Sequence, residues 1–157
     1  MHSVKVSKIA LVCLGLLMSA PSLAQARLDL HALRGRVVYV DFWASWCTPC
    51  RQSFPWMKAL ESAYASQGLS VVAIDLDHDR RDAQRFLRVF QPNFAVIFDP
   101  AGTLAQRFKV MGMPTSVLID RDGKVRYQHV GFLLQERAQY ERQVRGLLAE
   151  QPSGAGS

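Results

Sequence analysis

The sequence is poor in cysteine. Three of its 157 residues are cysteines, namely Cys13, Cys47 and Cys50, whereas small exported domains that rely on disulfides for stability use more. The chain also lacks internal repeats and long low-complexity tracts, and 49% of its residues are hydrophobic. We therefore expect one globular domain that is large enough to bury its own core.

The sequence offers little that resembles a membrane-spanning helix at its N-terminus. The apolar run over residues 9–20 has 12 residues, whereas a spanning helix needs about 20. Two lysines precede this run, and small residues that include Ala24 and Ala26 follow it. This pattern predicts a secretory signal peptide over residues 1–26, cleaved after Ala24 or after Ala26. An uncleaved signal that anchors the chain in the membrane is the alternative.

Charge of one sign is not strongly in excess. The formal net charge is +6, and removing residues 1–26 takes away Lys5 and Lys8 and no acid, which leaves +4. The arginines are mixed with acids, as in "DHDRRDAQRFLR", and are not interleaved with aromatic residues. We therefore do not expect nucleic acid as a partner.

Strand and helix signals alternate along residues 27–150, and the strand signals are short runs rich in Val, Ile and aromatic residues. We expect strands over residues 36–44, 69–77, 95–99, 115–120 and 125–131, and helices over residues 49–67, 79–90, 103–108 and 135–150. This order predicts an α/β domain with a central mixed β-sheet covered by helices on both faces. Residues 151–157 are expected to form a disordered tail.

Cys47 and Cys50 remain once residues 1–26 are removed, and they lie where the first strand gives way to a helix. A sulfur at Cys47 would face unpaired backbone N–H groups and the positive end of the helix dipole. Such positions lower the pKa of a thiol from about 8.5 to roughly 3.5–7.5. Cys50 lies one turn later on the same helix face. The pair is therefore suited to thiol–disulfide exchange, in which Cys47 attacks and Cys50 resolves the mixed disulfide.

Two other interpretations of the cysteine pair stay open. A structural disulfide would close a very small ring, which removes little chain entropy and stabilises weakly. A zinc or copper site would need further ligands, and His31, His78 and His129 show no paired ligand spacing. We therefore expect a redox-active disulfide in place of a bound cofactor or metal.

Asp41 lies within the apolar run "VVYVDFWA". Burial among apolar neighbours raises the pKa of a carboxyl group, and a buried carboxylate is costly unless it is paired or protonated. A proton carrier is needed in exchange, because the resolving thiol loses a proton to attack and regains it on reduction. We therefore expect Asp41 to carry that proton. A carboxylate that is hydrogen-bonded to local backbone is the structural alternative.

Three further acids lie at the end of the second strand and just after it, in "DLDHD". Acids between a strand and a helix are typical of turns and helix caps, so we prefer this interpretation to a cation site. We expect Asp77 or Asp79 to cap the following helix.

Several segments resemble a known family when they are taken together. "VDFWASWCTPC" resembles the active-site segment of thioredoxins, and "GMPTSVLID" resembles their second signature. The signal peptide, "RQSFPWM" and "VVAIDLDHDRRDAQRFL" are more similar to the TlpA/ResA-like thiol:disulfide oxidoreductases of the bacterial envelope. The resemblance covers residues 28–148 and implies a thioredoxin-like fold.

The resemblance also implies roles for particular residues. Cys47 matches the exposed nucleophile of the family and Cys50 its resolving thiol. The substrate-binding residues that it implies are the aromatic Trp46 beside the cysteines, Thr48 and Pro49 between them, and the cis-proline Pro114 with its neighbours Met113 and Thr115. A cis bond before Pro114 would expose the Met113 backbone to a substrate peptide.

Two positions differ from many ResA-like members. Those members carry a glutamate three residues after the second cysteine and an asparagine in the preceding strand, where this chain has Ser53 and Asp41. Asp41 matches thioredoxin itself, which favours it as the proton carrier. The narrow substrate selectivity of cytochrome-maturation members is therefore not carried over.

We expect a monomeric periplasmic thiol:disulfide oxidoreductase that reduces protein disulfides through Cys47 and Cys50. The family implies a membrane electron donor that recharges it. One alternative is an oxidant that donates disulfides, because Thr48 and Pro49 do not settle the direction. Another is a redox-inert or copper-binding module with the same fold.

Overall fold

The computed structural model describes residues 28–153, so the signal peptide expected over residues 1–26 lies outside the described part. Its helices and strands follow the expected order. They are β1 (Val37–Trp43), α1 (Thr48–Tyr64), β2 (Leu69–Asp75), α2 (Arg80–Phe90), β3 (Ala95–Phe98), α3 (Thr103–Arg107), β4 (Thr115–Ile119), β5 (Val125–Val130) and α4 (Arg137–Ala149), with short 3₁₀ turns at Ala65–Gln67 and Leu134–Glu136. Within residues 28–153, we find no helix with the length and apolar character that crossing a membrane requires.

The five strands form one mixed sheet in the order β3-β2-β1-β4-β5. β1 pairs in parallel with β2 and antiparallel with β4, so it occupies the centre. Every residue of β1 is buried, as expected for a strand that is covered on both faces. The α/β class and the mixed sheet predicted from the sequence are confirmed.

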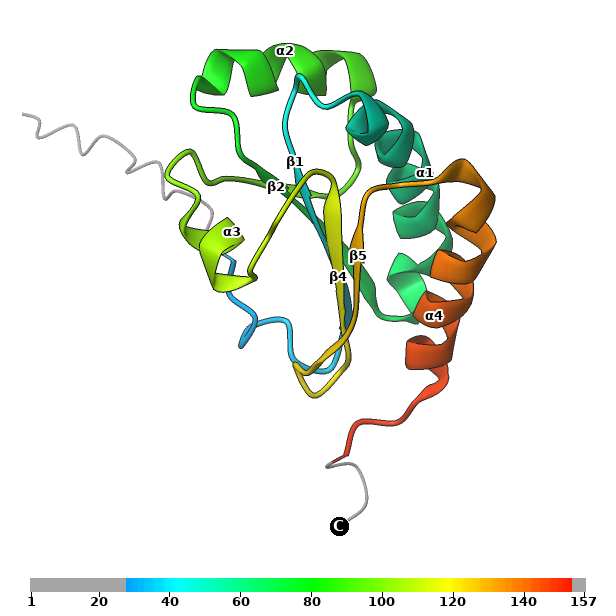
Figure 1. Ribbon diagram of the computed structural model, residues 1–157. Helices are drawn as coiled ribbons and strands as arrows, with labels where there is room; N and C mark the ends of the chain where they lie inside the picture. The colour runs from blue at the N-terminus through cyan, green and yellow to red at the C-terminus, as the bar shows by residue number, and fades with distance from the viewer. Residues whose placement is uncertain (1–27, 154–157) are drawn as a thin grey trace, which may run out of the picture.

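One face of the sheet is covered by α1 and α4, which lie side by side in Figure 1. Side chains alternate along a strand, and Val37, Tyr39 and Trp43 of β1 point to this face. They pack with Phe54 and Met57 of α1 and with other residues of the larger core cluster. Burial of each such side chain contributes roughly 1.5–3 kcal/mol, so this layer holds α1 firmly above β1.

The other face is covered by α3 and by the segment before β1 (Figure 1). Val38, Val40 and Phe42 point to it and pack with Leu104 and Phe108, among others. The rings of Phe42 and Phe108 lie 5.5 Å apart between centroids. The sheet is therefore covered on both faces, as predicted.

α2 lies across the end of the sheet at which β1 and β2 finish (Figure 1). Phe86 of α2 packs against Trp43 and Phe54, with ring centroids 4.6 and 4.8 Å apart. Asp79 caps the helix, because its side chain accepts a hydrogen bond from the Arg81 N–H at 2.9 Å. Of the two expected caps, Asp79 is therefore the one used.

Candidate redox site

The two cysteines lie at the junction of β1 and α1. A tight turn follows Trp43, and within it the N–H of Cys47 donates to the carbonyl of Ala44 at 3.1 Å. Cys47 then caps α1, because its sulfur accepts a hydrogen bond from the N–H of Cys50 at 3.3 Å. Pro49 lies in the first turn of the helix, where its missing N–H costs nothing.

Cys47 and Cys50 form a disulfide with an S–S distance of 2.04 Å and Cα atoms 5.3 Å apart. Cys50 is fully buried, and 4% of Cys47 is exposed. The resemblance implied an exposed nucleophile, and the structure corrects this: Cys47 is more accessible than Cys50 but belongs to the same core cluster. The reason is tertiary packing, since the core cluster that includes Cys47 is built from residues of several strands and helices.

The residues around the cysteines differ in exposure. Trp46 is 70% exposed, Thr48 is exposed and Pro49 is half-buried. An exposed tryptophan beside a nearly buried disulfide gives an incoming protein an apolar surface to contact. The substrate-binding role of these three residues stays a prediction.

The segment before β4 adds a second side to the site. The peptide bond between Met113 and Pro114 is cis, and Met113 packs against the core cluster that contains both cysteines. Pro114 and Thr115 are buried. The Thr115 hydroxyl donates to the carbonyl of Gly112 at 2.6 Å, and the carbonyl of Pro114 accepts from the N–H of Gly131 at 2.7 Å. These bonds hold the loop in place near the end of β1, where Thr115 pairs with Phe42.

Asp41 lies in the middle of β1 and is 1% exposed. It points to the same face as Tyr39 and Trp43, and so toward the layer that contains Cys47 and Cys50. Burial raises the pKa of the Asp41 carboxyl well above its usual range. Its Oδ2 atom is buried and has no hydrogen-bond partner within residues 28–153, which argues against the alternative of a carboxylate held by local backbone.

Two acids that the sequence interpretation treated as turn or cap residues belong to the site. Asp77 accepts from both the N–H and the hydroxyl of Ser45, two residues before Cys47. Asp75 ends β2 and is fully buried, and one of its carboxyl oxygens has no hydrogen-bond partner in the described part of the chain. Asp75 could have been found from the sequence, since it ends the apolar run "LSVVAI" much as Asp41 interrupts its own run.

A metal site at the cysteine pair that used further ligands would take them from side chains of residues 28–153. No three His, Cys, Asp or Glu side chains within that range come close enough to share an ion. Of the histidines, His78 is exposed, whereas His129 is half-buried and its Nε2 lies 2.8 Å from Oε1 of Gln143.

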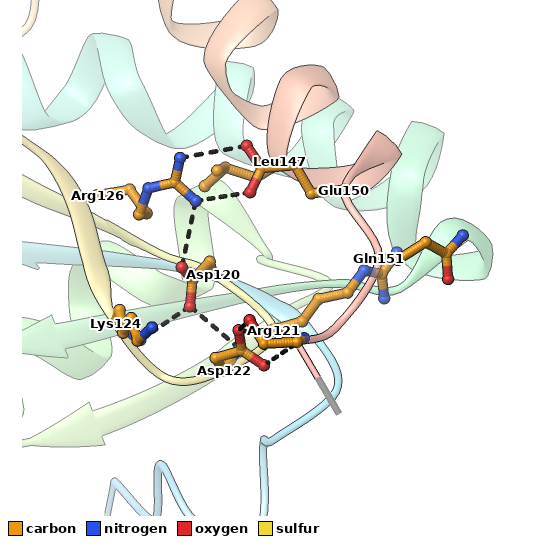
Figure 2. A pocket seen from close by; sticks show the side chains of 9 residues that line it. Asp120, Arg121, Asp122, Lys124, Arg126, Leu147, Glu150 and Gln151 are labelled. Atoms are coloured by element: carbon orange, nitrogen blue, oxygen red, sulfur yellow. Dashed lines mark hydrogen bonds and ion pairs between the residues drawn. The ribbon is translucent and has the colours of Figure 1, made fainter. Parts of the chain in front are cut away.

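A polar pocket lies at the opposite end of the sheet (Figure 2). There Arg126 pairs with Asp120 at 3.2 Å and with Glu150 at 2.6 Å, while the N–H of Ser153 donates to Asp122 at 3.1 Å. β4 runs antiparallel to β1, so its end at this pocket lies beside the start of β1, whereas Cys47 follows the end of β1. Because these charges are paired with one another, we assign the chemistry to the cysteine end.

Comparison with known proteins agrees with this assignment. The family model described as Redoxin matches residues 18–144. A protein of Chlorobium tepidum that is provisionally named thiol:disulfide interchange protein DsbE is 49% identical, with a TM-score of 0.75, over 76% of this chain and 85% of that one. A thioredoxin family thiol:disulfide interchange protein of the same organism is 26% identical, with a TM-score of 0.67, over 76% of this chain and 84% of that one.

Curated relatives are similar over a shorter part of their length. The thiol-disulfide oxidoreductase ResA of Bacillus thuringiensis subsp. konkukian is 33% identical over 99 residues, which is 63% of this chain and 57% of that protein. The chain therefore spans a little over half the length of such relatives. The solved structures show that its fold is thioredoxin-like.

Proposed function

The chain belongs to the redoxin family, and from that premise we propose that it is a thiol:disulfide oxidoreductase that exchanges the Cys47–Cys50 couple with protein substrates. The observation that carries the proposal is the disulfide itself, which lies at the N-terminus of α1 and whose more accessible residue is Cys47. Backbone N–H groups at a helix start stabilise a thiolate. The same position serves a catalytic couple better than a structural staple, because a ring this small stabilises weakly.

The reaction proceeds in two exchanges when the protein acts as a reductant. The Cys47 thiolate attacks one sulfur of a substrate disulfide, a bond forms between them, and the other substrate sulfur leaves and takes a proton. Cys50 then loses its proton and attacks the sulfur of Cys47. This second exchange releases the remaining substrate thiol, so two electrons pass to the substrate and the protein ends as the Cys47–Cys50 disulfide.

Asp41 accepts the proton that Cys50 releases, directly or through a water molecule. Support comes from its burial on the sheet face beneath α1 and from the raised pKa of its carboxyl group. A group whose pKa lies nearer to neutrality transfers protons more efficiently at physiological pH than an ordinary aspartate does. Trp46, Met113 and the loop around Pro114 receive the substrate beside Cys47.

The proposal also covers the cellular location of the protein and the direction of electron flow. The pattern of residues 1–26 supports export to the periplasm, where the couple works as a reductant that a membrane electron donor recharges. The partners are protein thiols and disulfides. These statements rest on the sequence pattern and on the family resemblance.

The reduction potential of the Cys47–Cys50 couple tests the direction. The couple is equilibrated with dithiothreitol or glutathione buffers, and the fraction of oxidised protein is measured. A value near that of thioredoxin, about −270 mV, is expected for a reductant, whereas a value near −120 mV would make the protein an oxidant. If the couple does not titrate reversibly in this range, the protein would instead be a redox-inert module. Cu(I) binding that Cys47→Ser abolishes would point instead to a copper-binding one.

A further inference from the structure

Asp77 accepts two hydrogen bonds from the turn that carries Cys47. The two carboxyl oxygens of Asp77 accept separately from Ser45, one from its N–H at 2.9 Å and the other from its hydroxyl at 3.0 Å. Both partners are at least partly buried, so water competes poorly for these bonds. Ser45 follows Ala44, whose carbonyl accepts from the N–H of Cys47. Asp77 therefore acts on the position of Cys47 through a short chain of hydrogen bonds.

Asp75 lies directly against this anchor. It is the last residue of β2, opposite Trp43 of β1, and its Oδ1 accepts from the N–H of Asp77 at 3.3 Å. Its side chain is completely buried, and its Oδ2 has no partner among the described residues. A buried and incompletely satisfied carboxyl group is costly, so its presence beside the anchor calls for a reason.

We propose that Asp75 and Asp77 form a proton-dependent anchor for the active-site turn, in which protonated Asp75 leaves Asp77 free to hold Ser45 and ionised Asp75 repels it. The expected movement of the Ser45 turn does not depend on catalysis. The expected effect of this movement on the exchange rate rests on the proposed exchange activity. Asp75 and Asp77 are positioning residues, since they act on Cys47 only through Ser45.

The electrostatics of the pair support this arrangement. Burial first, and then the side chain and the charge of Asp77, raise the pKa of Asp75 to about 8, whereas the hydrogen bond from the Asp77 N–H acts in the opposite direction. Two carboxylates in one buried site repel each other, so one keeps its proton until higher pH. Ionisation of Asp75 near that pH places two like charges together. The repulsion is relieved when the Asp77 carboxylate moves away from Ser45.

The charged groups on the surrounding elements have contacts of their own, and those nearest to Ser45 include Asp82 and Arg85 of α2, which pair with each other and line a surface pocket with Ser45. Asp99, after β3, accepts from three backbone N–H groups at the start of α3. On α2, the Arg80 guanidinium lies over the Phe98 ring at 4.1 Å, and the Asp79 cap pairs with Arg81. Arg51 of α1 lies over the Phe86 ring at 5.5 Å and lines a surface pocket with Ser45.

Asp41 of β1 is a further buried acid on the sheet face to which Asp75 points. The effects of the two acids must be separated by experiment. The two acids lie on neighbouring strands, and both have raised pKa values. A titration seen only in the exchange rate could come from either of them. A measurement at Ser45 is specific to the proposed anchor.

The test is an NMR titration of the oxidised full-length protein between about pH 6 and 10, which brackets the raised pKa. The Ser45 amide resonance and the side-chain carboxyl carbon of Asp75 are expected to shift with a common midpoint near pH 8. Asp75→Asn should remove the Ser45 transition, because its amide mimics the protonated acid. Asp41→Asn and the remote control Asp122→Asn should keep it.

The same variants are then compared in the exchange reaction. The ratio of the wild-type rate to that of Asp75→Asn is expected to fall by about threefold or more as the pH rises through the Asp75 titration, since misplacing a reacting group slows chemistry steeply. A Ser45 transition that persists in Asp75→Asn, or is missing in the wild type, would overturn the proposal. A protein without exchange activity at any pH would contradict the proposed function, and the NMR titration would still decide the anchor.

Discussion

The N–H of Cys50 donates to the sulfur of Cys47 across 3.3 Å, which makes the first cysteine the cap of the helix that carries the second. Such a sulfur is favoured as a thiolate by the helix start. Cys50 has no comparable position, because it lies inside the helix and is fully buried. The two cysteines are therefore expected to play unequal parts.

Single cysteine substitutions should reveal that inequality. Cys47→Ser is expected to reduce exchange to the uncatalysed level, because no thiolate remains to attack. Cys50→Ser is expected to accumulate mixed disulfides with substrate, because the second exchange cannot occur. Insulin reduction with dithiothreitol measures the first effect, and mass spectrometry of the trapped adduct measures the second. Appreciable turnover by Cys47→Ser would refute its role as nucleophile.

Asp41→Asn should slow exchange at neutral pH by about a hundredfold, the lower end of what a positioned acid or base contributes. Asparagine keeps the size of the side chain but cannot take up a proton. Asp122→Asn, in the hairpin at the far end of the sheet, is the matched control and should leave the rate unchanged. A pH–rate profile that is the same in Asp41→Asn and in the wild type would rule out Asp41 as the proton carrier.

Asp41→Asn should slow exchange but increase the free energy of unfolding. Burial raises the pKa of Asp41 in the folded protein, while the unfolded chain ionises near pH 4. Above that pH the unfolded state has released a proton that the folded state still holds, so the stability of the wild type falls as pH rises toward the folded pKa.

Asp41→Asn removes this loss. It is therefore expected to gain stability relative to the wild type between about pH 5 and 8, by at least about 1 kcal/mol, the equivalent of one pKa unit. Urea unfolding at both pH values measures the difference. A difference in unfolding free energy that is the same at both pH values would show that Asp41 titrates as an ordinary exposed acid.

Much of this fold follows from local sequence signals. The apolar run around β1, the proline in the first turn of α1 and the cap at Asp79 each predict an element from residues that lie within it. The cysteine spacing likewise places both sulfurs at one helix start. Such features depend on neighbours in sequence, so the sequence alone is enough to predict them.

The contacts that complete the site depend on partners far along the chain. Ser45 and Asp77 are 32 residues apart and meet only because β1 and β2 pair in register, with Trp43 opposite Asp75. From the sequence, Asp77 is indistinguishable from a turn residue. The burial of Cys47 likewise reflects packing that no local pattern specifies.

Arg121 offers a test of whether the two ends of the sheet act independently. Its guanidinium donates to the carbonyls of Gly35, Gln67 and Leu148, at 2.7, 3.2 and 3.0 Å. It thereby ties the start of β1, the turn before β2 and the end of α4 to the hairpin shown in Figure 2. Gly68 allows this approach, since a Cβ there would lie 2.8 Å from the guanidinium.

Arg121→Ala is expected to lower the free energy of unfolding by about 1–3 kcal/mol, because charged hydrogen bonds are lost and three carbonyls lose their partner. Arg121→Lys should recover only part of this, since a lysine cannot reproduce the planar fork that reaches several carbonyls at once. Both variants should exchange disulfides at the wild-type rate under conditions in which they are folded. If Arg121→Ala slowed exchange as much as Asp41→Asn does, the far end of the sheet would have to contribute to the position of Cys47.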